Sequence, residues 1–164
     1  MRIKNLKLAF LSLFLGLANM CFAAPPLSPQ LDVVTRLYKS FAFEAAEKVD
    51  SSKPSFLDSS RSVLLTYLMP DLTALILADR KCAAMTHEIC RLDFSPLWGG
   101  QDNTGATFKI GKTKDDNKVQ VKILDPSGSS TQIYRLSLTP LGWRIQDIEF
   151  ESLHTSLLEL LKAN

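Results

Sequence analysis

The hydrophobic positions of this chain follow two different spacings, and the change between them falls near residue 105. Before it, apolar residues recur every three or four positions, the spacing of one helix face. After it, they alternate with polar residues, the spacing of β-strands that are covered on one face. The sequence therefore predicts an α+β fold, in which N-terminal helices pack on a curved antiparallel sheet.

Three helices are expected in the first part of the chain. The longest covers residues 31–49, with apolar positions at Leu31, Val34, Tyr38, Phe41, Ala45 and Val49. Lys53-Pro54 interrupts the pattern, and the polar run 58–60 then caps a second helix that continues to Leu68. A third helix begins at Pro70 and runs up to the cysteines, because proline suits the first turn of a helix.

Alternation predicts four strands, around residues 108–110, 119–123, 134–138 and 143–150. The connecting segments 114–117, 125–129 and 139–142 are rich in turn-forming residues, so consecutive strands are neighbours in the sheet. A short C-terminal helix with Leu157, Leu158 and Leu161 follows.

The last strand changes its buried face part-way along. Trp143 and Ile145 share one side with Asp147, whereas Ile148 and Phe150 lie on the other side. Either a bulge lies near Gln146-Asp147, or both faces are covered, the second by the tail helix or by another subunit. The second alternative makes a homodimer through the sheet possible.

Residues 1–23 have the composition of a secretory signal peptide. A basic start is followed by the uncharged apolar run 8–22, which is shorter than the roughly 20 residues of a membrane-spanning helix. Cys21-Phe22-Ala23 places small residues at the two positions that signal peptidase reads. We therefore expect cleavage after Ala23, export to the bacterial periplasm, no stable membrane insertion, and one domain over residues 24–164.

Removal of the leader changes the charge of the protein. The whole chain has 19 basic and 17 acidic residues, but three of the basic residues and none of the acidic ones precede residue 24. The exported chain thus has 16 basic and 17 acidic residues, for a net charge of −1. A near-neutral protein without aromatic residues interleaved among its basic ones is not expected to bind nucleic acid.

The leader also contains one of the three cysteines, which leaves Cys82 and Cys90 in an oxidising compartment. A disulfide between them is the expected state. The alternative is a metal site formed by both cysteines with His87, and with His154 as a fourth ligand, but the spacing matches no common zinc pattern. The sequence therefore predicts neither a metal nor another cofactor.

Three helices followed by a sheet that ends in Gly142-Trp143-Arg144-Ile145 resemble the nuclear-transport-factor-2-like, or cystatin-like, superfamily. The stretch 92–102 further resembles a secreted bacterial family of unknown function within it, with Ser95 in place of the second Asp of an Asp-Phe-Asp-Pro segment. The resemblance implies a cystatin-like roll with a cone-shaped cavity between the helices and the sheet, and it carries no established activity.

Seven residues are candidates for contact with a ligand in or near that cavity. Asp93, Trp98, Gln101 and Asp102 belong to the loop beside its mouth, where Trp98 has the alternative role of packing over the open end. Tyr38, Trp143 and Asp147 are the candidates from the helix and the last strand. Asp147 would act as an acid or base if buried in the cavity, and otherwise accepts backbone or arginine hydrogen bonds.

The polar positions of the strands predict a basic ladder on the sheet face away from the helices. Its members are Lys109, Lys118, Lys122, Arg135 and Arg144. Such a face is either simply solvated, with lysines guarding against edge association, or it docks an acidic protein or an anionic envelope component.

Three functions remain open from the sequence. The favoured one is a non-enzymatic periplasmic domain that binds a small apolar ligand or a protein partner. The second is a periplasmic immunity or inhibitor protein that neutralises a toxin directed at the envelope. The third is a small cavity enzyme of the isomerase or dehydratase type that uses Asp147 with a tyrosine.

Overall fold

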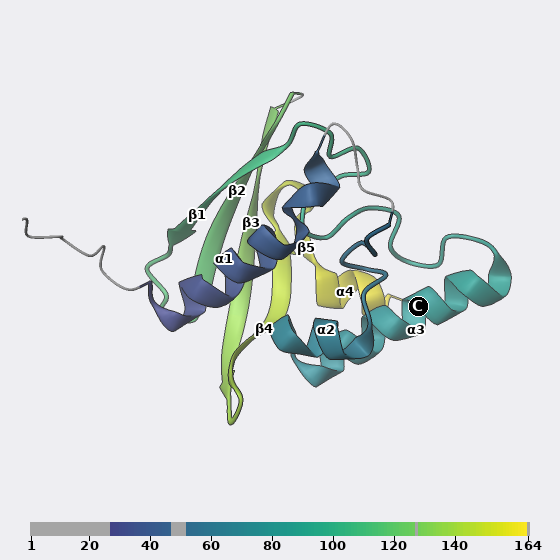
Figure 1. Ribbon diagram of the computed structural model, residues 1–164, viewed down its shortest axis with the longest axis horizontal. Coiled ribbons are helices and arrows are strands. Elements are labelled where there is room, and N and C mark those ends of the chain that lie inside the picture. Colours follow the sequence, from purple (N-terminus) through teal and green to yellow (C-terminus); the bar gives the residue numbers. More distant parts are fainter. Residues whose placement is uncertain (1–26, 47–51, 127, 164) are drawn as a thin grey trace, which may run out of the picture.

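The computed structural model describes residues 27–46, 52–126 and 128–163. The predicted signal peptide and its cleavage site lie outside these residues. Within them, the chain forms four α-helices and one five-stranded antiparallel sheet with the order β1-β2-β3-β4-β5 (Figure 1). The α+β architecture, with its N-terminal helices and short C-terminal helix, is therefore confirmed. No helix in the described part is long and apolar enough to cross a membrane.

The first helix, α1 (Pro29–Phe41), is shorter than the sequence pattern predicts. Its start follows the expected chemistry, since the Ser28 hydroxyl accepts a hydrogen bond from the Leu31 amide and a proline occupies the first turn. After Phe41 the chain tightens into a 3₁₀ turn, Ala42–Ala45. This turn places Glu44 within hydrogen-bonding distance of Phe56 and Ser95. The predicted end of the helix, residues 47–49, lies outside the described part.

Helices α2 (Arg61–Tyr67) and α3 (Pro70–Thr86) begin where the sequence predicts. The Ser60 hydroxyl caps α2, and proline starts α3. Between the two helices the chain pairs with the sheet, because the Met69 amide donates to the Ile145 carbonyl at 2.8 Å and Leu68 forms a parallel bridge with Ile145. The junction between α2 and α3 is thus fixed against strand β4.

The sheet consists of β1 (Thr107–Lys112), β2 (Lys118–Asp125), β3 (Gly128–Thr139), β4 (Gly142–Phe150) and the short β5 (Thr155–Ser156). The β3–β4 turn ends at Gly142, whose φ of +96° is a conformation that other residues rarely adopt. In β4 the pairing shifts, since Arg135 pairs with Asp147 and the next residue, Leu136, pairs with Ile145. Gln146 is therefore the extra residue of a bulge, which confirms the first explanation for the change of face.

The core lies between α1 and the inner face of the sheet. Figure 1 shows α1 running across the sheet, which agrees with its contacts to β1, β2 and β4. Helix α4 (Leu157–Lys162) packs against β4 and α3, and its Ser156–Glu159 capping box fixes its start. Side chains that are almost fully buried come from α1, α2, α3, β2, β4 and α4: Val34, Leu37, Leu64, Leu72, Val121, Ile123, Ile145, Ile148 and Leu157.

Candidate functional site

Aromatic rings fill the space between α1 and the sheet. The Tyr38 ring lies 4.7 Å from that of Phe108 and 5.6 Å from that of Trp98, measured between centroids. The Tyr134 ring is 6.0 Å from Tyr38. Such contacts amount to ordinary close packing. The position expected for a cone-shaped apolar cavity is therefore occupied by side chains, and Tyr38 has a packing role.

A polar network crosses this aromatic cluster. The Tyr38 hydroxyl donates to the Leu97 carbonyl oxygen at 2.5 Å, and it lies 2.9 Å from the Tyr134 hydroxyl. The Gln132 Oε1 atom accepts from Tyr134 at 3.0 Å. Burial raises the pKa of both phenols, so both are neutral and serve as hydrogen-bonding groups.

One group of this network has no hydrogen-bond partner among the described residues. It is the Nε2 amide of Gln132, on a side chain that is only 1% exposed. Buried amides are rarely left in this state, since an unsatisfied donor destabilises the fold. A β-carbon placed on Gly99 would lie 3.1 Å from Nε2, so Gly99 lies directly over the amide.

Gly99 also lines a pocket of about 400 Å³, whereas Gln132 is not part of its lining. The pocket lies between the segment 98–106 and the turn that joins β2 to β3. Its polar lining includes Asp102, Asn103, Ser129 and Ser130, and its apolar lining includes Trp98 and Ile123. Gly99 has a φ of +72°, and a side chain there would be both strained and close to Gln132.

The four residues predicted from the loop 92–102 have different positions. Trp98 and Asp102 line the pocket, whereas Asp93 and Gln101 do not and instead bond to each other at 3.1 Å. The hydrogen bond from the Thr104 amide holds the pKa of Asp102 below its ordinary value. The wall of the pocket therefore carries an ionised carboxylate at neutral pH.

Glu44 holds the pocket wall in place, although no sequence pattern singled out this residue. Its Oε1 atom accepts from the Phe56 amide at 2.5 Å. Its Oε2 atom accepts from the Ser95 hydroxyl and from Trp98 Nε1, each at 3.2 Å. Burial raises the pKa of this carboxyl, and the hydrogen bonds oppose the rise. Contacts to residues this distant leave no local sequence pattern.

Asp147 lies on the opposite face of the sheet from the aromatic cluster, together with its strand partner Arg135. One carboxylate oxygen accepts from Arg135 at 2.5 Å, and the other accepts from the amides of Ile148 and Leu158. The bulge at Gln146 turns this residue outward, while Trp143 stays partly buried against the core. Asp147 thus has the structural role that was its alternative.

The predicted basic ladder is interrupted by acidic and backbone groups. Arg135 forms ion pairs with both Asp147 and Glu149, and Glu149 also pairs with Lys118 at 3.4 Å. Arg144 Nε donates to the Leu65 carbonyl at 3.0 Å, so this side chain binds the backbone of α2. The remaining members, Lys109 and Lys122, face each other across β1 and β2 with no ion pair to any described residue.

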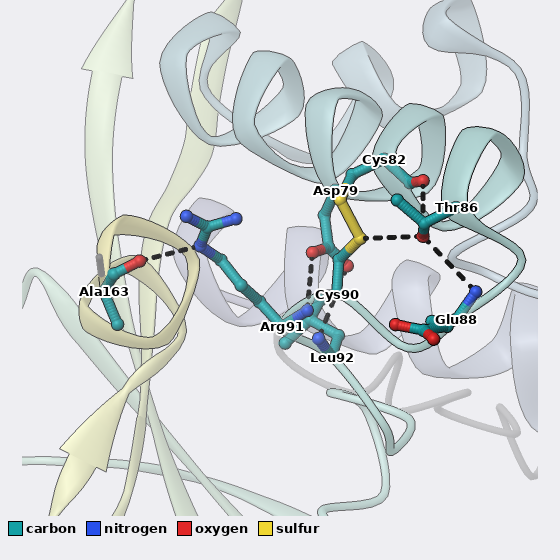
Figure 2. The surroundings of a disulfide bond; sticks show 8 residues. All are labelled: Asp79, Cys82, Thr86, Glu88, Cys90, Arg91, Leu92 and Ala163. Carbon is teal, nitrogen blue, oxygen red and sulfur yellow. Dashed lines mark hydrogen bonds between the residues drawn. A yellow bond between two sulfur atoms is a disulfide. The ribbon is translucent and has the colours of Figure 1, made fainter.

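Cys82 and Cys90 form the predicted disulfide, which leaves no free thiolate for the alternative metal site. Figure 2 shows its surroundings at the end of α3. The Asp79 carboxylate accepts from the amides of Arg91 and Leu92, and Arg91 Nε donates to the Ala163 carbonyl at 2.8 Å. The segment that follows the disulfide is thereby joined to the residue after α4. None of these residues lines the pocket beside Gly99.

Comparison with known proteins gives little further guidance. No protein-family model matches this chain, and no curated protein matches it. A solved structure of a phospholipid-binding protein from Ralstonia solanacearum, in complex with a phospholipid, is similar over 80% of this chain and 68% of its own. The sequence identity is 16% and the TM-score 0.36, so this likeness carries no argument about function.

Proposed function

We propose that this protein is an exported, non-enzymatic domain that binds a small hydroxyl-rich ligand, such as a neutral saccharide unit, in the pocket between residues 98–106 and the β2–β3 turn. The observation that carries this proposal is the unpartnered, buried Gln132 amide next to Gly99, a residue that lines the pocket although Gln132 itself does not. A buried polar group without a partner marks a place where hydrogen-bonding capacity is unused.

The chemistry of the lining supports the choice of ligand. Asp102, Asn103 and the hydroxyl of Ser130 accept hydrogen bonds from ligand hydroxyls, while Trp98 and Ile123 offer apolar contact to the C–H groups of a ring. The lowered pKa of Asp102 keeps a negative charge at the pocket, which disfavours anionic ligands. The polar lining also favours a hydroxyl-rich ligand over the apolar one expected from the sequence.

A binding role is proposed in preference to catalysis because of Asp147. This carboxylate is engaged by Arg135 and two backbone amides on the outer face of the sheet, and both core tyrosines are neutral. The order of three helices before a curved sheet also supports a place in the nuclear-transport-factor-2-like superfamily. That membership is part of the proposal.

Titration of the exported protein with glucose, N-acetylglucosamine and sorbitol, followed by amide NMR, tests this function. Saturable shifts are expected at residues 99–103 and 128–130. Ser130→Ala and Asp102→Asn should each weaken binding about fivefold, the effect of one lost hydrogen bond. Ser137→Ala, on the outer face of β3, is the matched control and should bind as the wild type does. Shifts confined to other regions would reject the site.

Export is tested separately by osmotic-shock fractionation and N-terminal sequencing of the recovered protein. We expect it in the periplasmic fraction with Ala24 as its first residue, because the leader has the three parts that signal peptidase substrates share. Recovery of a chain that begins at Met1 from the cytoplasm would contradict this part of the proposal.

A further inference from the structure

Strand β1 forms an edge of the sheet. It pairs along its six residues, Thr107–Lys112, with β2, and no other strand of the described chain pairs with it. An edge strand directs alternate N–H and C=O groups outward, where an additional strand can bind them. Figure 1 shows β1 at the side of the molecule farthest from α3 and α4.

The charge beside this edge is positive and is not neutralised within the described chain. Lys109 lies directly opposite Lys122 on the outer face, and both are exposed. Two like charges in directly opposed positions destabilise a strand pair. No described acidic side chain pairs with either lysine, whereas Lys118 and Arg135 on the same face have acidic partners.

We propose that the β1 edge binds an extended acidic protein segment by strand addition, with carboxylates on alternate residues that face Lys109 and reach towards Lys122. The backbone groups of β1 provide the hydrogen bonds, and the lysines select the charge of the partner. Successive residues of a strand point to opposite faces, so every second residue of the segment meets the lysine side.

A second copy of this chain fits the same edge less well. Antiparallel pairing of β1 with itself about a two-fold axis would place the Lys109–Lys122 pairs of both copies on one continuous face. Four positive charges would then lie in neighbouring strands without an acidic partner, which opposes association. The charge pattern therefore favours an acidic segment of another protein.

The probe is an end-blocked eight-residue peptide of alternating Thr and Glu, titrated into the exported protein and followed by amide NMR. Saturable shifts are expected at residues 107–112, and binding should weaken as salt is added. Lys109→Glu should weaken binding at least fivefold, since it replaces attraction by repulsion. Lys39→Glu, an equally exposed lysine on α1, is the matched control and should change binding less than twofold.

Two modified peptides separate backbone pairing from charge. A peptide with alternate N-methylated residues keeps its charge but cannot form the strand ladder, so it should not bind. A Thr-Lys peptide keeps the backbone but reverses the charge, and it too should not bind. The proposal is overturned if either binds as well as the Thr-Glu peptide, if millimolar Thr-Glu peptide shifts no β1 amide, or if sedimentation shows a dimer that excludes the peptide.

Discussion

The outer face of the sheet has two halves that treat charge differently. On β3 and β4, Arg135 lies between Asp147 and Glu149, and Glu149 also pairs with Lys118, the first residue of β2. On β1 and the middle of β2, Lys109 and Lys122 face each other without an acidic partner in the described chain. The same kind of sequence, lysine or arginine at alternate strand positions, thus produces an internal ion-pair network in one half and an unsatisfied positive patch in the other.

The role of a basic residue on a strand therefore cannot be assigned without knowing which residues the neighbouring strand places beside it. Glu149 and Asp147 hold the network half together, and α4 depends on it through the Leu158 amide. The patch half contributes nothing comparable to the fold. Variants that break the ion-pair network on β3 and β4 should therefore lower the stability of the fold. Variants of Lys109 and Lys122 should affect binding more than folding.

The largest expected effect comes from Asp147→Ala. This change leaves the amides of Ile148 and Leu158 without an acceptor and removes one of the two acidic partners of Arg135. We expect the free energy of unfolding to fall by about 3 kcal/mol, as for buried groups left unsatisfied. Urea denaturation measures it. Asp116→Ala, in the exposed β1–β2 turn, should change stability by less than about 0.5 kcal/mol. Equal losses in both variants would remove the distinction between the halves.

A smaller effect is expected from Glu149→Gln, which makes the network half more like the patch half. It breaks the ion pairs with Lys118 and Arg135, all three side chains being about one-third to one-half exposed. Exposed pairs are weak, so we expect a loss of about 1 kcal/mol that shrinks in high salt. Glu151→Gln, just beyond the strand, is the control in the same denaturation series and should show no salt-dependent loss.

The converse variant, Lys122→Glu, gives the patch half an ion pair across β1 and β2. The new carboxylate would face Lys109, so the free energy of unfolding should rise by about 0.5 kcal/mol. The same protein should bind the Thr-Glu peptide more weakly. A gain in stability without a loss of binding would show that these lysines guard the edge and do not recognise a partner.

Glu44 is a half-buried carboxylate that, unlike Asp147, has no cation paired to it among the described residues. Desolvation raises the pKa of Glu44 from its ordinary 4.5, so the folded state holds the proton more tightly than the unfolded state. The stability that this provides is present below pH 4.5 and is lost as the pH rises through the folded-state pKa. Glu44→Gln should abolish this slope in denaturation measured from pH 4 to 7. The exposed Glu88→Gln should retain it.

Much of the fold could be predicted from the sequence because its signals are local. Ser60 and Pro70 mark helix starts within one turn of the chain, and hydrophobic alternation fixes the strands. The change of face at Gln146 even located the bulge. The early end of α1 was missed, because the apolar position at Ala45 continues the helical spacing through the 3₁₀ turn.

The candidate site was harder to predict, since its parts meet only in three dimensions. Trp98 and Asp102 were found because the loop combines aromatic, acidic and glycine residues. Strand alternation places Gln132 on the same face as Tyr134, but nothing local showed that its amide is buried without a partner. Glu44 looked like the solvent side of a helix. The face of Asp147 stayed open from the sequence because it depends on whether the neighbouring residue, Gln146, forms a bulge.

One oxygen of Asp147 accepts hydrogen bonds from both Ile148 in the bulged strand and Leu158 in α4. Opening either segment disturbs the acceptor of the other, so the tail helix and the irregular part of β4 should open as one cooperative unit. In hydrogen exchange, these two amides should then share a single protection factor, although ten residues separate them. The motions of the last helix would be those of the irregular part of β4.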